Sequence, residues 1–405
     1  MNHSTRGSAW DDVVNSSSHP GRSAVMAERL VLHIGTQKSG TTYLQRVLAA
    51  LSSTLRKKGV LYPTRLVGKR EIHNHEAAAY GLLGTESFPW VPRHRAEAQR
   101  DSWQALSDKI ARWDGTAIVS GEALSVIDAT AAERLVGSLD VPRTDVIITA
   151  RDLGRVIPSS WQQHIRNGRS TAFSTYLRQL DQRRGEGSSA DRRARWEADP
   201  DQTFWRAYAI GSLAQRWAAF SSSVRVVGVP RSGSDTNELW SRFVSATDLT
   251  TAAPSTAPDV DLVAANIGIT EPETLVLAGL NRALESGELP EPRRRAIRGR
   301  IVREAFVGRT DRGRRVALPA EWTDRVRAWA EQDLVELDET DAIFTGDRSD
   351  LLVDAGSTAT EPVDSEAVAD AAGAALALLG GLMPAEETPG EARGRRNRRS
   401  GGSGG

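Results

Sequence analysis

The chain has 405 residues, a formal net charge of zero and no cysteine. The neutral balance excludes a global field that would attract nucleic acid or an anionic membrane, so we expect no nucleic-acid partner. The absence of cysteine excludes disulfides, thiolate metal sites and cysteine nucleophiles. A chain of this length can still bury a sizeable core.

Both ends of the chain differ in composition from the middle. Residues 1–28 are rich in Ser, His and Asp without an apolar core, which predicts a flexible arm and no signal peptide. Residues 353–405 form a low-complexity tail that ends in arginines and Gly-Ser repeats, and we expect most of it to be disordered. Its apolar stretch, Ala371–Met383, is too short to span a bilayer, so we expect no transmembrane segment and a cytoplasmic protein.

Residues 29–352 have the pattern of one α/β domain, in which short apolar strands alternate with helical periodicity. Strands are expected at 30–34, 117–120, 145–150 and 224–229, and helices at 42–55, 95–113, 131–139, 155–166, 172–182, 204–220, 236–244, 271–286, 293–306 and 320–337. This order predicts a doubly wound parallel sheet, covered on both faces, with a helix-rich C-terminal half. The charged stretch 183–201 is predicted to be a long loop of the kind that often forms a lid.

The first predicted strand runs into the segment 35–42, GTQKSGTT, and then into a predicted helix. Such a turn directs free backbone N–H groups and the positive end of a helix dipole at one point, where Lys38, Thr41 and Thr42 add a charge and two hydroxyls. A Walker loop has its lysine after the second glycine, whereas Lys38 precedes Gly40. Only five of the 52 basic residues are lysines, so Lys38 is not expected from composition alone. We predict a phosphate-binding loop; the alternative is an ordinary Gly-Ser-Thr turn.

A second polar pair follows the strand at 145–150. Arg151 ends that strand, and Ser159 comes eight positions later in a predicted helix. Ligands of doubly wound sheets bind beyond the carboxyl ends of the strands, where Arg151 and Ser159 could both contact an anion. The alternatives are an ion pair between Arg151 and Asp152, and helix capping by Ser159 or Ser160 beside Pro158.

Together the Lys-Ser-Gly-Thr-Thr loop and the Arg151–Ser159 pair resemble the two anion-binding motifs of PAPS-dependent sulfotransferases, although Gln37 stands where that family usually has proline. The segment 149–162, His75 ahead of an alanine-rich helix, and Gly346-Asp347 resemble a bacterial, actinomycete-type (actinobacterial) branch of this family. The resemblance covers roughly residues 30–352.

The resemblance implies a P-loop-like three-layer fold and the donor PAPS (3′-phosphoadenosine 5′-phosphosulfate), with PAP as product and no metal. It assigns the 5′-phosphosulfate to the first loop and the 3′-phosphate to the second pair. The residues so assigned are Lys38, Ser39, Gly40, Thr41 and Thr42 for the first, and Arg151 and Ser159 for the second.

Transfer to a hydroxyl also requires a base, for which the sequence offers two candidates. Glu122 lies just past the predicted strand 117–120, and sulfotransferases that act on carbohydrate often carry a glutamate at such a place. His75, with His73 behind it, is the rival, because histidine titrates near neutral pH whereas Glu122 would need a pKa raised by burial. We favour Glu122. His33, inside the first strand, is expected to be structural, and His164 has no assigned role.

The expected activity is therefore transfer of a sulfuryl group to a hydroxyl of a carbohydrate, glycolipid or specialised metabolite. The alternatives are an ATP-dependent small-molecule kinase of P-loop-like fold and a non-catalytic nucleotide-binding protein. The sequence identifies neither the acceptor, whether small molecule or glycan, nor the oligomeric state. Aromatic residues able to stack on an acceptor ring have no predictable geometry; they are Trp90, Trp103, Trp113, Trp161, Trp196 and Trp205.

Overall fold

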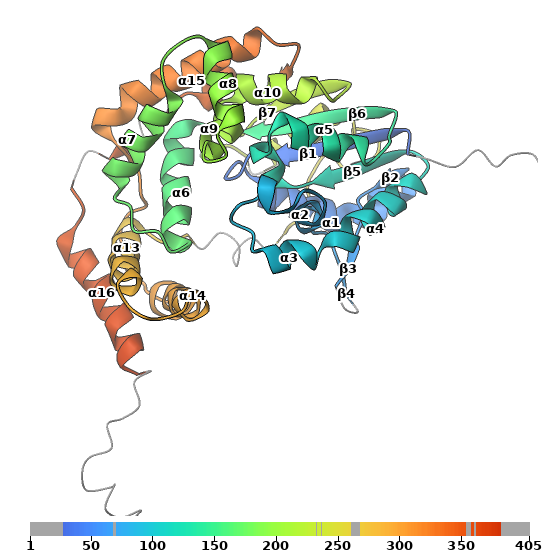
Figure 1. The fold of residues 1–405 in the computed structure, drawn as a ribbon. Helices are drawn as coiled ribbons and strands as arrows, with labels where there is room; N and C mark the ends of the chain where they lie inside the picture. The colour runs from blue at the N-terminus through green and yellow to red at the C-terminus, as the bar shows by residue number, and fades with distance from the viewer. Residues whose placement is uncertain are drawn as a thin grey trace, which may run out of the picture.

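The computed structural model describes residues 27–67, 70–231, 233–235, 237–260, 268–353, 358–359 and 362–381. At its centre lies a six-stranded sheet in the order β2-β5-β1-β6-β7-β9, with every neighbouring pair parallel (Figure 1). The strands are β1 Arg29–Gly35, β2 Val60–Leu61, β5 Thr116–Ser120, β6 Arg143–Ala150, β7 Ser223–Gly228 and β9 Ile343–Thr345. The α/β fold with a central parallel sheet is thus confirmed, and two short edge strands, β2 and β9, were not predicted.

Two short pairs of strands lie outside the central sheet. An antiparallel hairpin joins β3 (Arg65–Val67) to β4 (Arg70–Ile72). A parallel pair joins β8 (Leu318–Pro319) to β10 (Thr358–Ala359).

Helices cover both faces of the sheet, because alternate strand residues are apolar on both sides. On β1, Val31 packs in the cluster formed with α1 and α11, whereas Leu30, Leu32 and Ile34 pack in the larger cluster formed with most of the other helices. The helices on the first face are α1 Thr41–Lys57 and α11 Glu238–Ala246. The remaining helices are α2 His75–Ser87, α3 Arg93–Glu97, α4 Arg100–Ala111, α5 Ala129–Gly137, α6 Leu153–Arg166, α7 Phe173–Arg184, α8 Ser189–Ala198, α9 Thr203–Tyr208, α10 Ile210–Ala218, α13 Glu271–Glu285, α14 Glu291–Arg300, α15 Thr323–Asp338 and α16 Ser365–Gly380.

The long loop predicted at 183–201 is wrong, because α8 occupies most of it. Ser188 begins α8 with a capping box, in which its hydroxyl accepts from the Asp191 N–H and the Asp191 carboxylate accepts from the Ser188 N–H. Trp196 and Arg192 are buried, and Arg192 pairs with Glu336 on α15. The segment is therefore a packed part of the helical half of the domain.

The tail prediction is corrected for residues 365–380, which form α16. Ala371 is fully buried and Ala375 is 6% exposed, where α16 packs on α13 and on the π-helical turn Ile301–Phe306. Small side chains allow this close helix contact, so a stretch poor in large apolar residues still docks on the domain. Most of the predicted N-terminal arm and the end of the tail lie outside the described residues.

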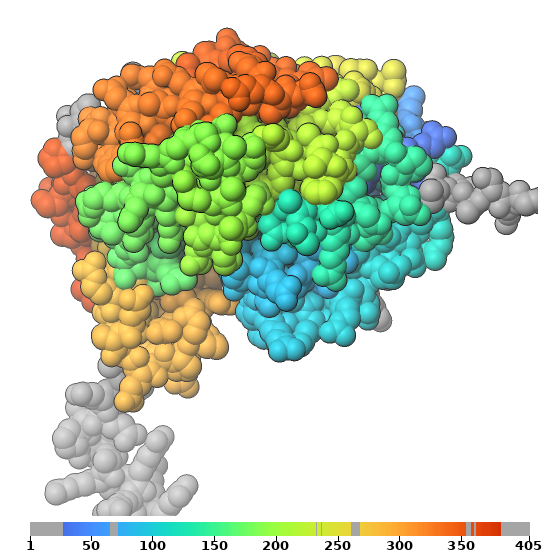
Figure 2. Space-filling view, turned by 45° about the horizontal axis from the view of Figure 1, so that its top comes forward, coloured from blue at the N-terminus to red at the C-terminus, as the bar shows by residue number. Residues whose placement is uncertain are grey.

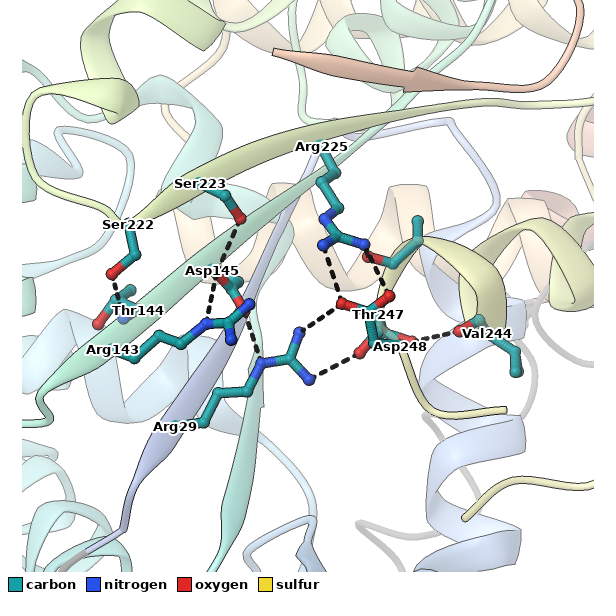
Figure 3. A network of polar contacts seen from close by, with 11 residues as sticks. Arg29, Arg143, Thr144, Asp145, Ser222, Ser223, Arg225, Val244, Thr247 and Asp248 are labelled. Carbon is teal, nitrogen blue, oxygen red and sulfur yellow. Dashed lines mark hydrogen bonds and ion pairs between the residues drawn. The ribbon is translucent and has the colours of Figure 1, made fainter. Parts of the chain in front are cut away.

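A buried ionic network fastens the amino-terminal edge of the sheet, opposite to the edge where ligands are expected (Figure 3). The Asp145 carboxylate on β6 is inaccessible to solvent and accepts from Arg29 Nε at 2.5 Å, Arg143 Nη2 at 3.1 Å and Ser223 Oγ at 2.7 Å. These contacts join β1, β6 and β7. Burial opposes ionisation of Asp145, but the three donors outweigh it and lower its pKa below the ordinary value.

Candidate functional site

The loop between β1 and α1 has the backbone geometry of an anion site. Gly35 and Gly40 have φ angles of 93° and 80°, and Lys38 stands in the left-handed region at 62°, which is uncommon for a residue with a Cβ. No side chain caps α1, so its first N–H groups are left for an external acceptor. A Cβ on Gly35 would lie 2.9 Å from Glu122 Cα, so glycine is required for the loop to approach Glu122.

Glu122 and Lys38 face each other across this loop. The Thr41 hydroxyl donates to Glu122 Oε2, and Lys38 Nζ donates to Gln163 Oε1 on α6 at 3.1 Å. Burial raises the pKa of Glu122, which Thr41 and Lys38 oppose. Burial lowers the pKa of Lys38, while Glu122 favours its charged form. A cation, a hydroxyl and a carboxylate of raised basicity therefore meet at the carboxyl edge of the sheet.

Among the other predicted loop residues, Thr42 is exposed on the first turn of α1, whereas Ser39 turns inward. Ser39 Oγ donates to Thr36 O at 2.5 Å and lies 2.7 Å from Thr149 Oγ1. The Ser39 hydroxyl is thus buried and bonded within the fold. Ser39 was assigned to the 5′-phosphosulfate, and its side chain is not placed for a direct contact with it.

The buried ring of His33 holds the same strand ends together, as expected of a structural histidine. Its Nδ1 lies 2.8 Å from Ser120 Oγ on β5, and its Nε2 lies 3.3 Å from Thr149 Oγ1 on β6. Complete burial lowers the pKa of His33 to about 3, so the ring is neutral. The network places the ends of β1, β5 and β6 in register beneath the loop.

His75 lies in the core with both ring nitrogens bound to backbone. Its Nδ1 accepts from the Ser120 N–H at 2.9 Å, and its Nε2 lies 2.7 Å from Pro63 O. This arrangement requires the neutral tautomer with the proton on Nε2, which leaves no nitrogen lone pair for a substrate proton. His73 likewise has Nδ1 3.2 Å from Pro63 O and stacks on Tyr62. These hydrogen bonds therefore argue against the predicted role of His75 as a base.

Arg151 lies next to the loop, as the end of β6 requires. Its Nη1 donates to Lys38 O at 3.3 Å, while its buried Nε has no partner among the described residues. Asp152 caps α6 and pairs with Arg155 at 2.5 Å, so the alternative of an Arg151–Asp152 pair is not what the structure shows. A buried donor without a partner beside this loop is the kind of group that an anion would satisfy.

Ser159 lies in the second turn of α6, because the helix begins at Leu153, earlier than predicted. It precedes Gln163 by four residues and hence shares its face, and Gln163 contacts Lys38. No contact joins Ser159 to Arg151 in the described residues, so the 3′-phosphate role of Ser159 stays a prediction.

Sequence analysis missed several residues that surround Glu122 and Arg151. Glu76 on α2 accepts from the Ala123 N–H at 3.0 Å and from the Tyr80 hydroxyl, and it raises the pKa of Glu122. Arg166 lies near Lys38 and disfavours the charged form of Lys38. Arg315 lies near Arg151 and disfavours the charged form of Arg151. The (i, i+4) spacing of Glu76 and Tyr80, directly after His75, was the one available sequence signal.

A pocket of about 520 Å³ lies elsewhere, beside β2 and the C-terminal ends of α1 and α4. No helix in the described part of the chain is long and apolar enough to cross a membrane. Comparison with models of known protein families and with curated proteins found no match for this chain. Its function is therefore inferred from the geometry given above.

Proposed function

We propose that the chain is a PAPS-dependent sulfotransferase that acts in the cytoplasm on a hydroxyl acceptor. The observation that carries the proposal is the meeting of Lys38, Glu122 and Arg151 around one loop at the carboxyl edge of the parallel sheet. A cation for a leaving oxygen, a base for a hydroxyl and a second cation for a remote phosphate are what this transfer requires.

In the proposed mechanism each residue has a separate task. The N–H groups at the start of α1 and the Lys38 ammonium bind the 5′-phosphosulfate, and Arg151, Ser159 and Arg315 bind the 3′-phosphate. Glu122 accepts the proton of the acceptor hydroxyl as its oxygen bonds to sulfur. The bond from sulfur to the bridging oxygen breaks, and Lys38 stabilises the electron pair left on PAP. Positioning and charge stabilisation supply the rate enhancement, by analogy with phosphoryl transfer.

The raised pKa of Glu122 supports its role as base. A carboxylate of ordinary pKa is a poor acceptor for a hydroxyl proton, and burial together with the nearby Glu76 makes Glu122 more basic. Thr41 orients the carboxylate by its hydrogen bond.

Ligand binding and turnover test the proposal together. We expect PAP to raise the melting temperature without metal, and ADP with magnesium to have little effect. Labelled PAPS should transfer its sulfuryl group to at least one member of a panel of sugars, phenols and alcohols, at the same rate with EDTA. Preference for ADP with magnesium would indicate a kinase, and PAP binding without turnover on any acceptor would indicate a non-catalytic nucleotide-binding protein.

A further inference from the structure

The pocket of about 520 Å³ beside β2 lies between the C-terminal ends of two helices, α1 and α4. The helix α1 begins at the candidate loop, and at 1.5 Å per residue its 17 residues are about 25 Å long. Figure 2 shows α4, in cyan, on the opposite side of the molecule from α16, in red, as does Figure 1. Lys38, Glu122 and Arg151 are not among the residues that line the pocket. It is therefore separate from the candidate site, and the proposed function assigns nothing to it.

Cationic side chains gather around this pocket, and none of the described residues that line it is a carboxylate. Arg56 comes from the last turn of α1, Lys109 from the last turn of α4, and Arg112 stands at the end of α4. Arg112 pairs with Asp108 at 3.4 Å. Arg56 and Lys109 have no carboxylate partner in the part of the chain that the structure describes. A concave surface lined by charges of one sign concentrates ions of the opposite sign.

Basic side chains are common in the last turn of a helix, where they interact with its free carbonyl groups. Here the two unpaired cations have other contacts. Lys109 Nζ donates to Thr64 O at 2.6 Å and to Thr64 Oγ1 at 3.3 Å, on the loop after β2. The Arg56 guanidinium lies over the Trp113 indole, 5.0 Å from the ring centroid, and no described residue accepts a hydrogen bond from it. The Arg56 guanidinium is therefore positioned by an aromatic ring and open to an external acceptor.

The rest of the pocket fits the uncharged part of an organic ligand. Tyr62 stacks on His73 with ring centroids 4.6 Å apart, and both residues line the pocket together with Trp113. Ser52 and Ser53 add two hydroxyls. The cavity volume lies within the range of about 300–1,000 Å³ found for sites of small organic molecules, so the pocket has room for more than a single inorganic ion.

The number of unpaired cations favours one kind of anion. A phosphate monoester carries about −1.5 to −2 charges at pH 7, whereas a carboxylate or a sulfate ester carries one. Arg56 and Lys109 match a dianion, and guanidinium and ammonium groups both bind phosphate oxygens by charge-assisted hydrogen bonds.

We propose that this pocket is a second anion-binding site and that it takes a small organic phosphate monoester. Arg56 and Lys109 bind the phosphate, and the organic part packs against Trp113 and the other aromatic side chains of the wall. The inference does not depend on the proposed sulfotransferase activity, because it involves none of the residues assigned to that reaction.

Fluorine NMR of the full chain labelled with 5-fluorotryptophan measures occupancy of the pocket. The chain has 11 tryptophans, and the Trp113 line is assigned from its loss in Trp113→Phe. Phenyl phosphate should shift this line in a saturable manner, whereas phenol at the same concentration should not. The line of Trp90, assigned in the same way, is the control and should not move, because Trp90 is 48% exposed and lies outside the pocket.

Isothermal titration calorimetry with phenyl phosphate gives the second readout. Arg56→Met should weaken binding roughly 10- to 150-fold, because the variant loses a hydrogen bond to a charged group. Lys57→Met removes the same charge from the next residue of α1, which is exposed and does not line the pocket, and should weaken binding less than about twofold. Lys38→Ala, which removes the cation of the candidate loop, should leave binding at the pocket unchanged.

Four results would overturn the inference. The first is an equal loss of affinity in Arg56→Met and Lys57→Met, which would indicate non-specific attraction to the end of α1. The second is a Trp113 line that phenyl phosphate leaves unmoved. The third is equal affinity for phenyl phosphate and inorganic phosphate, since the organic part would then contribute nothing. The fourth is binding that Lys38→Ala abolishes and Arg56→Met retains, which would place the anion at the candidate loop.

Discussion

Replacing Arg151 by methionine should separate the two ends of the proposed ligand. Methionine fills the space of the arginine stem but donates no hydrogen bond. In the structure Arg151 makes one long bond, at 3.3 Å, to Lys38 O and has a buried Nε without a partner among the described residues. A 3′-phosphate would satisfy this donor.

The expected size of the effect follows from these contacts. A hydrogen bond to a charged group contributes about 1.5–3 kcal/mol, so PAP should bind roughly 10- to 150-fold more weakly to the variant. Adenosine 5′-phosphate lacks the 3′-phosphate, so its binding to Arg151→Met can weaken only through loss of the bond from Arg151 to Lys38 O. That loss should be less than about 1 kcal/mol, or fivefold in affinity. Isothermal titration calorimetry of both nucleotides at one ionic strength measures the difference.

Arg155→Met is the matched control for this measurement. Arg155 lies four residues further along the chain and is paired with Asp152 at 2.5 Å, so its loss should affect the start of α6 and not the selectivity between the two nucleotides. Equal losses of PAP and adenosine 5′-phosphate in Arg151→Met would refute the assignment. Arg151 would then serve only to hold the Lys38 carbonyl.

Four further outcomes are expected. Lys38→Ala should lower turnover by roughly 10²–10³ and leave the melting temperature unchanged. The control Lys57→Ala, at an exposed residue, should change neither turnover nor melting temperature. Near-normal activity of Lys38→Ala would remove Lys38 from the mechanism. Glu122→Gln should lower kcat by about 10²–10⁴ at unchanged PAP affinity. Because the pKa of Glu122 is raised, wild-type kcat should fall as the pH is lowered, with a midpoint above the ordinary glutamate pKa of about 4.3. This acidic limb of the pH profile should be absent from Glu122→Gln. Asp145→Asn should lower the free energy of unfolding, measured with urea at pH 7, by about 3–5 kcal/mol. Because the pKa of Asp145 is lowered in the folded state, its carboxylate stabilises the protein at pH values above its unfolded pKa of about 3.9. The difference in free energy of unfolding between Asp145→Asn and the wild type should therefore disappear only below that pH. Deleting residues from Ser365 onward should lower the melting temperature by at least about 2 °C, because α16 buries Ala371 and Ala375; an unchanged value would show that the helix adds no stability.

The strand ends and the loop geometry were predictable from the sequence because local rules determine them. Apolar β-branched runs located β1, β5, β6 and β7, and parallel strands bring their carboxyl ends to one edge. Lys38, Glu122 and Arg151 each follow such a strand, so their proximity followed from topology.

Other features depend on contacts that no local pattern contains. Glu76 approaches Glu122 only because α2 packs beside the short helix Glu122–Val126. The helix α8 was mistaken for a loop because one of its buried residues is an arginine, Arg192, whose charge is compensated by Glu336 on α15. The edge strands β2 and β9 have two and three residues, too few to show a period.

The bond from Arg151 to the Lys38 carbonyl has a consequence for how this loop can change in evolution. Lys38 holds a left-handed conformation that costs a residue with a Cβ about 1–2 kcal/mol, and the bond that helps to secure it comes from a residue 113 positions away. A descendant that replaced Arg151 would lose part of this support and would gain from glycine at position 38, at the expense of the ammonium group. We therefore expect positions 38 and 151 to be inherited as a pair, with lysine kept wherever arginine is kept.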